Sequence, residues 1–247
     1  MRVYGERNEK IKGKEKRKNG DTGWQAGCFF GAMLLAIMTS TSVSADSEKQ
    51  WQFKVYLDDK HIGEHSYVVS DDADTQTIRS QANFDVKILF VTAFSYQHEN
   101  TEIWQNGCLS EIDASTVVNG KSSSVEGRRD KGIFSMQTNE SATLLDGCVS
   151  TFAYWDRDFL GKTQLLNSQT GELKPVKVSQ LGQVIYTHKK IEIEATRYEI
   201  VVDENPISLW YVQDGRWLGL ETLAKGGRVL RYHPVDVPDA QLVLSGI

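Results

Sequence analysis

Apolar side chains recur at every second position through most of the chain, and this alternation is the feature that most constrains its fold. Residues 51–57 (WQFKVYL) show it first, with apolar side chains at the odd positions. A period of two residues is typical of half-buried strands. Turn dipeptides such as Asn106-Gly107, Asn119-Gly120 and Asp146-Gly147 separate the alternating runs. The pattern therefore predicts antiparallel strands joined as hairpins.

The predicted strands form a long meander. Before the middle of the chain they are residues 51–57, 62–69, 75–84, 94–104, 108–117, 123–129, 133–138 and 142–145. After it they are residues 173–181, 184–188, 191–195, 197–202, 207–212, 216–223 and 228–232. So many sequential strands cannot stay in one flat sheet. We expect an all-β fold, an antiparallel meander curled into a barrel or half-barrel.

One segment interrupts the meander. Residues 152–166 (FAYWDRDFLGKTQLL) are rich in aromatic side chains and lack the period of two, and residues 156–160 suit a short helical turn. We therefore expect a short helical or irregular insert near 152–166. Its large side chains are costly to leave in water, so we expect it to pack into the mouth or concave face of the sheet, against the strand that carries Trp210.

The N-terminal segment has the layout of an export signal. A lysine- and arginine-rich lead precedes thirteen apolar or small residues, 26–38, and small residues follow at 43–45 (VSA). Thirteen residues are fewer than the roughly 20 that span a bilayer. The pattern predicts a signal peptide over residues 1–45, cleaved near Ala45, and a single β-domain over 46–247 in the periplasm, without a stable membrane anchor.

The predicted mature domain is acidic. Residues 1–45 hold eight of the 28 basic and four of the 33 acidic residues, which leaves 20 basic and 29 acidic residues and a net charge of −9. This charge argues against nucleic acid or anionic phospholipid headgroups as the main partner.

Two cysteines, Cys108 and Cys148, remain after removal of the predicted signal peptide. Each directly follows a turn dipeptide, so both are expected at the start of a strand just after a chain reversal. In an oxidising compartment a disulfide is the leading interpretation. Two buried free thiols are the alternative, and metal ligation by two cysteines alone is a weaker third.

A histidine motif raises the question of zinc. His61 and His65 lie in HIGEH, which matches the H-x-x-E-H pattern of one class of zinc peptidases. That chemistry needs both histidines on one face of a helix, whereas the surrounding pattern predicts a strand. Positions i and i+4 of a strand are about 13 Å apart, too far for a shared ion. We therefore predict no metal site and no cofactor.

His98 is a candidate contact for a ligand. In a strand it shares a face with Tyr96 and Trp104, and on an inward face it would serve as a general base, with Glu99 or a nearby carboxylate, or as a ligand contact. A hydrogen-bonded structural histidine is the alternative. No motif assigns a catalytic residue.

Aromatic residues of the second half, among them Tyr154, Trp155 and Trp210, have the size to line a cavity for an apolar ligand, although core packing is their ordinary role. The candidate ligand-binding residues are therefore His98, Tyr154, Trp155 and Trp210.

Several sequence blocks resemble an uncharacterised domain-of-unknown-function family of exported proteins from Gram-negative bacteria. The blocks are VYLDDKHIGEHSY (55–67), FDVKILFVTAFSYQHENTEIWQNGCL (84–109), DGCVSTFAYW (146–155), LLNSQTGE (165–172) and LWYVQDGRWLGLE (209–221). The resemblance implies that both cysteines belong to the family pattern, which strengthens the disulfide interpretation. It also implies that His65 belongs to the pattern and His61 does not. The family brings no established activity.

Three functions follow as hypotheses. The first is a periplasmic, non-enzymatic β-domain that binds an apolar or lipid-like small molecule in the concave face of its sheet. The second is an envelope enzyme, of hydrolase or isomerase type, that uses His98 with a nearby carboxylate. The third is an accessory protein of an envelope complex. A large apolar cavity would favour the first, a polar cleft around His98 the second, and a filled core the third.

Overall fold

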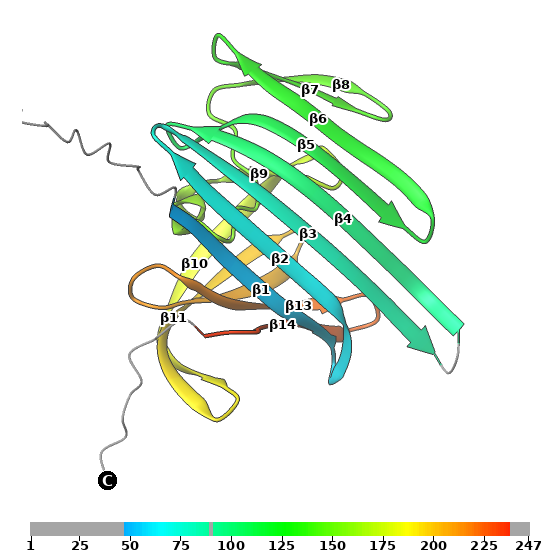
Figure 1. Ribbon diagram of the computed structural model, residues 1–247, viewed down its shortest axis with the longest axis vertical. Helices are drawn as coiled ribbons and strands as arrows, with labels where there is room; N and C mark the ends of the chain where they lie inside the picture. Colours follow the sequence, from blue (N-terminus) through cyan, green and yellow to red (C-terminus); the bar gives the residue numbers. More distant parts are fainter. Residues whose placement is uncertain (1–46, 89–90, 238–247) are drawn as a thin grey trace, which may run out of the picture. The chain divides into compact units, whose positions relative to one another are not determined.

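A computed structural model describes residues 47–88 and 91–237, and the predicted signal peptide lies outside the described residues. These residues form one antiparallel sheet of 14 strands (Figure 1). The first eight strands are β1 (Ser47–Leu57), β2 (Lys60–Asp72), β3 (Thr75–Ile88), β4 (Val91–Gln105), β5 (Cys108–Val118), β6 (Lys121–Asp130), β7 (Ile133–Thr138) and β8 (Ala142–Asp146). The other six are β9 (Gln164–Leu166), β10 (Leu173–His188), β11 (Ile191–Val202), β12 (Asn205–Tyr211), β13 (Trp217–Ala224) and β14 (Arg228–Pro234).

The order of the strands in the sheet follows the chain, with two departures. Consecutive strands pair with each other, but β1 also pairs with β14, and no pairing joins β8 and β9. Those two strands are the edges of the sheet, which does not close on itself. The predicted all-β meander is therefore confirmed, and its form is an open, curled sheet rather than a closed barrel.

The core follows from the alternation. In β1, Phe53 and Val55 are fully buried, whereas Gln52 and Lys54 between them are exposed. The apolar face of β1 joins residues from β2, β3, β4, β5 and β12 to β14 in one core. A second, smaller cluster of Ile193, Ala195, Val212 and Leu218 forms apart from it.

Two glycines shape the strands. Gly63 in β2 lies so close to β3 that an added Cβ would be 1.9 Å from the Asn83 carbonyl oxygen. Gly182 has a φ of +102° and stands at a register shift between β10 and β11. The sequence predicts a strand end at this glycine, which is wrong: β10 continues through it, because a bulge absorbs the irregularity without breaking the pairing.

The predicted insert is confirmed. Between β8 and β9 the chain leaves the meander and forms a short 3-10 helix, η1 (Arg157–Gly161), which the Asp156 side chain caps by accepting from the Asp158 amide. Figure 1 shows this helix close to β9. Phe159 is 2% exposed, so the helix anchors the insert to the core through its aromatic side chain.

Candidate functional site

Strand β4 carries the central row of the candidate site. Five inward residues alternate along it with outward ones, and they are Tyr96, His98, Asn100, Glu102 and Trp104. The last four are all less than 9% exposed. Three polar side chains in succession on a buried face are unusual, because buried polar groups need hydrogen-bond partners.

Glu102 accepts three hydrogen bonds. The donors are Asn100 Nδ2 at 2.8 Å, Trp104 Nε1 at 2.8 Å and Thr151 Oγ1 at 3.1 Å. Burial raises the pKa of Glu102, and these three hydrogen bonds oppose the rise. In the part of the chain that the structure describes, no cation forms an ion pair with this carboxyl group.

His98 bridges two elements. Its Nδ1 lies 2.9 Å from Thr116 Oγ1 of β5, and its Nε2 lies 3.4 Å from Ser168 Oγ in the turn after β9. Burial lowers the pKa of His98 to about 4, so the ring is neutral near pH 7. Glu99, the neighbour proposed as its partner, is exposed and accepts from Gln81 on the other face of the strand. The structure therefore does not bring His98 and Glu99 together.

His65 of β2 reaches the same region. Its Nδ1 lies 3.2 Å from Tyr232 Oη and 3.4 Å from Tyr67 Oη. Burial lowers the pKa of His65 to about 3, and nearby His98 adds to the effect. Within residues 47–88 and 91–237, neither His65 Nε2 nor Asn100 Oδ1 has a hydrogen-bond partner.

Both His65 and Asn100 line a cavity of about 300 Å³. Most of its polar lining comes from β2 to β4 and from four loop residues, and this part comprises His65, Ser80, His98, Asn100, Glu102, Thr151, Asn167, Ser168 and Gln169. Most of its apolar lining comes from β11 to β14, namely Val202, Ile207, Leu220 and Leu230. Each side also holds one residue of the other kind, the apolar Ile78 of β3 and the polar Thr222 of β13. Six aromatic residues complete it, namely Tyr67, Tyr96, Phe152, Tyr154, Trp155 and Tyr232. The cavity is thus neither purely apolar nor a purely polar cleft.

The insert supplies one side of the cavity. Tyr154 accepts a hydrogen bond at its carbonyl oxygen from Tyr211 Oη of β12, over 2.9 Å. Trp155 packs edge-to-face on Trp104, with ring centroids 5.6 Å apart. The insert therefore packs on the concave side of the sheet and contacts β12, the strand that carries Trp210, through Tyr211.

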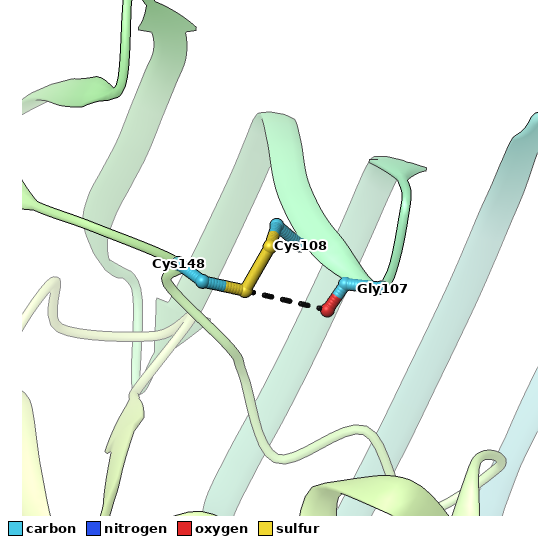
Figure 2. The surroundings of a disulfide bond; sticks show 3 residues. All are labelled: Gly107, Cys108 and Cys148. Carbon is cyan, nitrogen blue, oxygen red and sulfur yellow. Dashed lines mark hydrogen bonds between the residues drawn. A yellow bond between two sulfur atoms is a disulfide. The ribbon is translucent and has the colours of Figure 1, made fainter.

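A disulfide fixes the start of the insert. Cys108 begins β5 as predicted, but the strand start predicted at Cys148 is wrong, because this residue lies in the irregular segment after β8. Cys108 and Cys148 are bonded, with Cα atoms 5.1 Å apart (Figure 2), which confirms the predicted pairing. Figure 2 also shows the Gly107 carbonyl oxygen, 3.5 Å from Cys148 Sγ. Just beyond the disulfide, the Leu109 amide donates to the Val149 carbonyl oxygen over 3.0 Å. The segment that leads to Thr151 is therefore tied to the start of β5.

The structure brings three of the four candidate ligand-binding residues together. His98, Tyr154 and Trp155 all line the cavity. Trp210 does not: it packs against the smaller cluster, 5.7 Å from the Tyr186 ring, and the Arg197 guanidinium lies 5.6 Å from its own ring. Adjacent Leu209 and Tyr211 are fully buried in the main core, so alternation directs Trp210 to the other face of the sheet.

Sequence reasoning missed His65, Asn100 and Glu102 as site residues. The signal was present in β4, where the face that holds Tyr96, His98 and Trp104 must also hold residues 100 and 102. Among the described residues, no group of three or more His, Cys, Asp or Glu side chains is placed to hold a metal ion. His61 is exposed and His65 buried, and both belong to a strand.

Comparisons with known proteins place the chain by family and fold. A family model for a domain of unknown function, DUF6134, matches residues 53–235. A crystal structure of a β-barrel-like protein of DUF1849 from Brucella abortus is similar, with a TM-score of 0.58 and 13% sequence identity. The alignment covers 78% of this chain and 98% of that one, and at such low identity it bears on fold alone.

A search of functionally curated proteins finds no match to this chain. In the described residues, no helix is long and apolar enough to cross a membrane. Because the family model spans most of the chain, including every strand of the cavity, the protein belongs to the DUF6134 family.

Proposed function

We propose that this protein is a periplasmic binding protein for a small amphipathic molecule, which occupies the cavity between β2 to β4, the insert and β11 to β14. The observation that carries the proposal is the lining itself. One part of it is apolar, another is polar, and two polar atoms in it, His65 Nε2 and Asn100 Oδ1, lack partners among the described residues.

Unpartnered buried polar atoms argue for an occupant. Leaving a buried donor or acceptor unsatisfied costs about 1–3 kcal/mol, and native proteins contain few such groups. Two of the four such atoms in the described part of the chain line this one cavity. A molecule with a hydrogen-bonding end would satisfy both atoms.

The size of the cavity limits the ligand. About 300 Å³ is at the lower end of the range for small-molecule sites. A whole diacyl phospholipid is far larger than this volume. The apolar lining then favours a small molecule with a short apolar body, or a single short chain, rather than a complete membrane lipid.

Two observations support the periplasm as the place of action. Residues 26–38 and 43–45 carry the pattern of a cleavable export signal. The disulfide between Cys108 and Cys148 is a bond that persists in oxidising compartments.

The proposal is tested with N-phenyl-1-naphthylamine, a neutral apolar dye that fluoresces more strongly in apolar surroundings. We expect saturable fluorescence enhancement with the wild-type protein. Ile207→Trp should abolish it, because Ile207 is a half-buried residue of the apolar lining. Ile185→Trp makes the same change at a 53% exposed position outside the cavity and should leave the enhancement intact. No saturable enhancement with the wild type, or equal enhancement in all three proteins, would contradict the proposal.

A further inference from the structure

We propose that the polar end of the ligand is a protonated amine, which Glu102 and Asn100 bind inside the cavity. This inference rests on the proposed function and deepens it, since it assigns the chemical class of the ligand. The charges, the hydrogen-bond acceptors and the aromatic rings of the lining support it.

The charge balance of the cavity is one-sided. Glu102 is a carboxyl group in its lining, and no lysine or arginine belongs to the lining among the described residues. The two histidines do not supply a positive charge either, because burial lowers the pKa of His65 to about 3 and that of His98 to about 4. A ligand with a carboxylate or phosphate group would meet a carboxyl group and no cation. A ligand with an ammonium group would meet an opposite charge.

The hydrogen-bonding capacity also favours a donor. Asn100 gives its Nδ2 to Glu102 and leaves Oδ1 as an acceptor without a partner. Because Nδ2 and Oδ1 share one carbon, Asn100 Oδ1 lies within about 5 Å of Glu102 Oε1. Two acceptors thus lie within reach of a single donor group. An ammonium group has three donors and no acceptor, so it suits this pair better than a carboxylate does.

Aromatic rings line the same cavity as these acceptors. Tyr96, Tyr154 and Trp155 belong to the same lining, together with Phe152, Tyr67 and Tyr232. Aromatic faces attract ammonium groups, and cages of such rings are a known means of recognising organic cations. An acidic side chain, an unpartnered acceptor and an aromatic lining therefore point to the same ligand class.

Ionisation of Glu102 and binding of the amine support each other. Burial raises the pKa of Glu102, which favours its neutral form when the cavity holds no cation. An ammonium group next to the carboxylate lowers that pKa again and compensates for its burial.

The test compares three probes of equal chain length with the wild-type protein, by isothermal titration calorimetry at neutral pH. We expect n-hexylamine to bind at least about tenfold more tightly than 1-hexanol, and hexanoate to bind more weakly than 1-hexanol. If 1-hexanol or hexanoate binds as tightly as the amine, the inference is wrong and the proposed function stands. If none of the three binds, both are wrong.

Variants test whether Glu102 provides the preference for the amine over the alcohol. Glu102→Gln should weaken binding of n-hexylamine about tenfold and leave binding of 1-hexanol nearly unchanged. Glu99→Gln, on the exposed face of the same strand, should change neither. Equal losses for amine and alcohol in Glu102→Gln would assign Glu102 a purely structural role and overturn the inference. The wild-type comparison remains decisive if Glu102→Gln does not fold.

Discussion

Asn100 and Glu102 lie two residues apart on the inward face of β4, and Asn100 Nδ2 donates a hydrogen bond to Glu102 Oε1 over 2.8 Å. This pair places an amide and a carboxyl group where the alternation of a strand would normally place apolar side chains. The carboxyl group also joins β4 to the insert, through its hydrogen bond from Thr151. The polar part of the cavity is thus a structural connection as well as a candidate binding surface.

Removing the carboxyl group should therefore destabilise the protein. Glu102→Ala leaves the donors of Asn100, Trp104 and Thr151 without their acceptor, and we expect the free energy of unfolding to fall by about 3 kcal/mol or more. Urea denaturation measures this loss. Glu99→Ala, on the exposed face of the same strand, serves as the control and should stay within about 0.5 kcal/mol of the wild type. Similar losses in the two variants would contradict a stabilising role for the three hydrogen bonds that Glu102 accepts.

The buried histidines predict a loss of stability in acid. The pKa of His65 is about 3 and that of His98 about 4, both below the ordinary value of 6.5, so the unfolded chain takes up protons at a higher pH than the folded protein does. The contribution of each neutral ring to the free energy of unfolding is fully present above about pH 6.5. It is lost as the pH falls, by about 1.4 kcal/mol per pH unit for each histidine, down to about pH 4 for His98 and pH 3 for His65.

Urea denaturation at a series of pH values between about 7.5 and 4 measures that slope. His98→Gln should make stability less dependent on pH in this window, because one of the buried rings with a lowered pKa is gone. His61→Gln, at an exposed position, should leave the slope as in the wild type. An unchanged slope in His98→Gln would show that this ring does not titrate differently in the two states.

The sequence predicted the hairpins well and the long-range pairing poorly. Dipeptides such as Asn106-Gly107 mark reversals between neighbouring strands, so local chemistry determines most of the strand order. The pairing of β1 with β14, for example Phe53 with Pro234, has no local signal, because it joins segments from the two ends of the domain. The bulge at Gly182 was missed for the opposite reason, since a glycine inside a strand looks like a turn.

The site was predicted only in part, and alternation explains both outcomes. His98 was found because aromatic residues share its face. Asn100 and Glu102 were missed because polar side chains in a strand are usually directed to solvent. Trp210 was included although fully buried Leu209 and Tyr211 flank it, and their burial shows which face of β12 is turned to the main core.

The disulfide should stabilise both the fold and the cavity. It closes a loop of 40 residues and ties down the segment that leads to Thr151 and Trp155. We expect Cys108→Ser/Cys148→Ser to lower the free energy of unfolding by about 2–4 kcal/mol. The same change should weaken binding of N-phenyl-1-naphthylamine under conditions in which the protein remains folded. Full stability in the double variant would contradict the role assigned to this bond.

Gly63 should tolerate no side chain. An added Cβ would lie 1.9 Å from the Asn83 carbonyl oxygen, so Gly63→Ala must displace β2 from β3. We expect a loss of about 3 kcal/mol or more, or failure to fold. Gly120→Ala is the matched control, because Gly120 also has a positive φ but nothing lies within 4 Å of an added Cβ, and it should cost only about 1 kcal/mol. Thermal unfolding compares the two, and equal costs would refute the close approach.

Native mass spectrometry of the protein purified from its proposed location, the periplasm, tests most directly whether the cavity is a binding site for a small molecule. The wild-type protein and Ile185→Trp should each carry an additional small-molecule mass that is lost on denaturation. Ile207→Trp, which fills the apolar part of the lining, should carry none. A wild-type protein without a bound mass, or an equal bound mass in Ile207→Trp, would contradict the account.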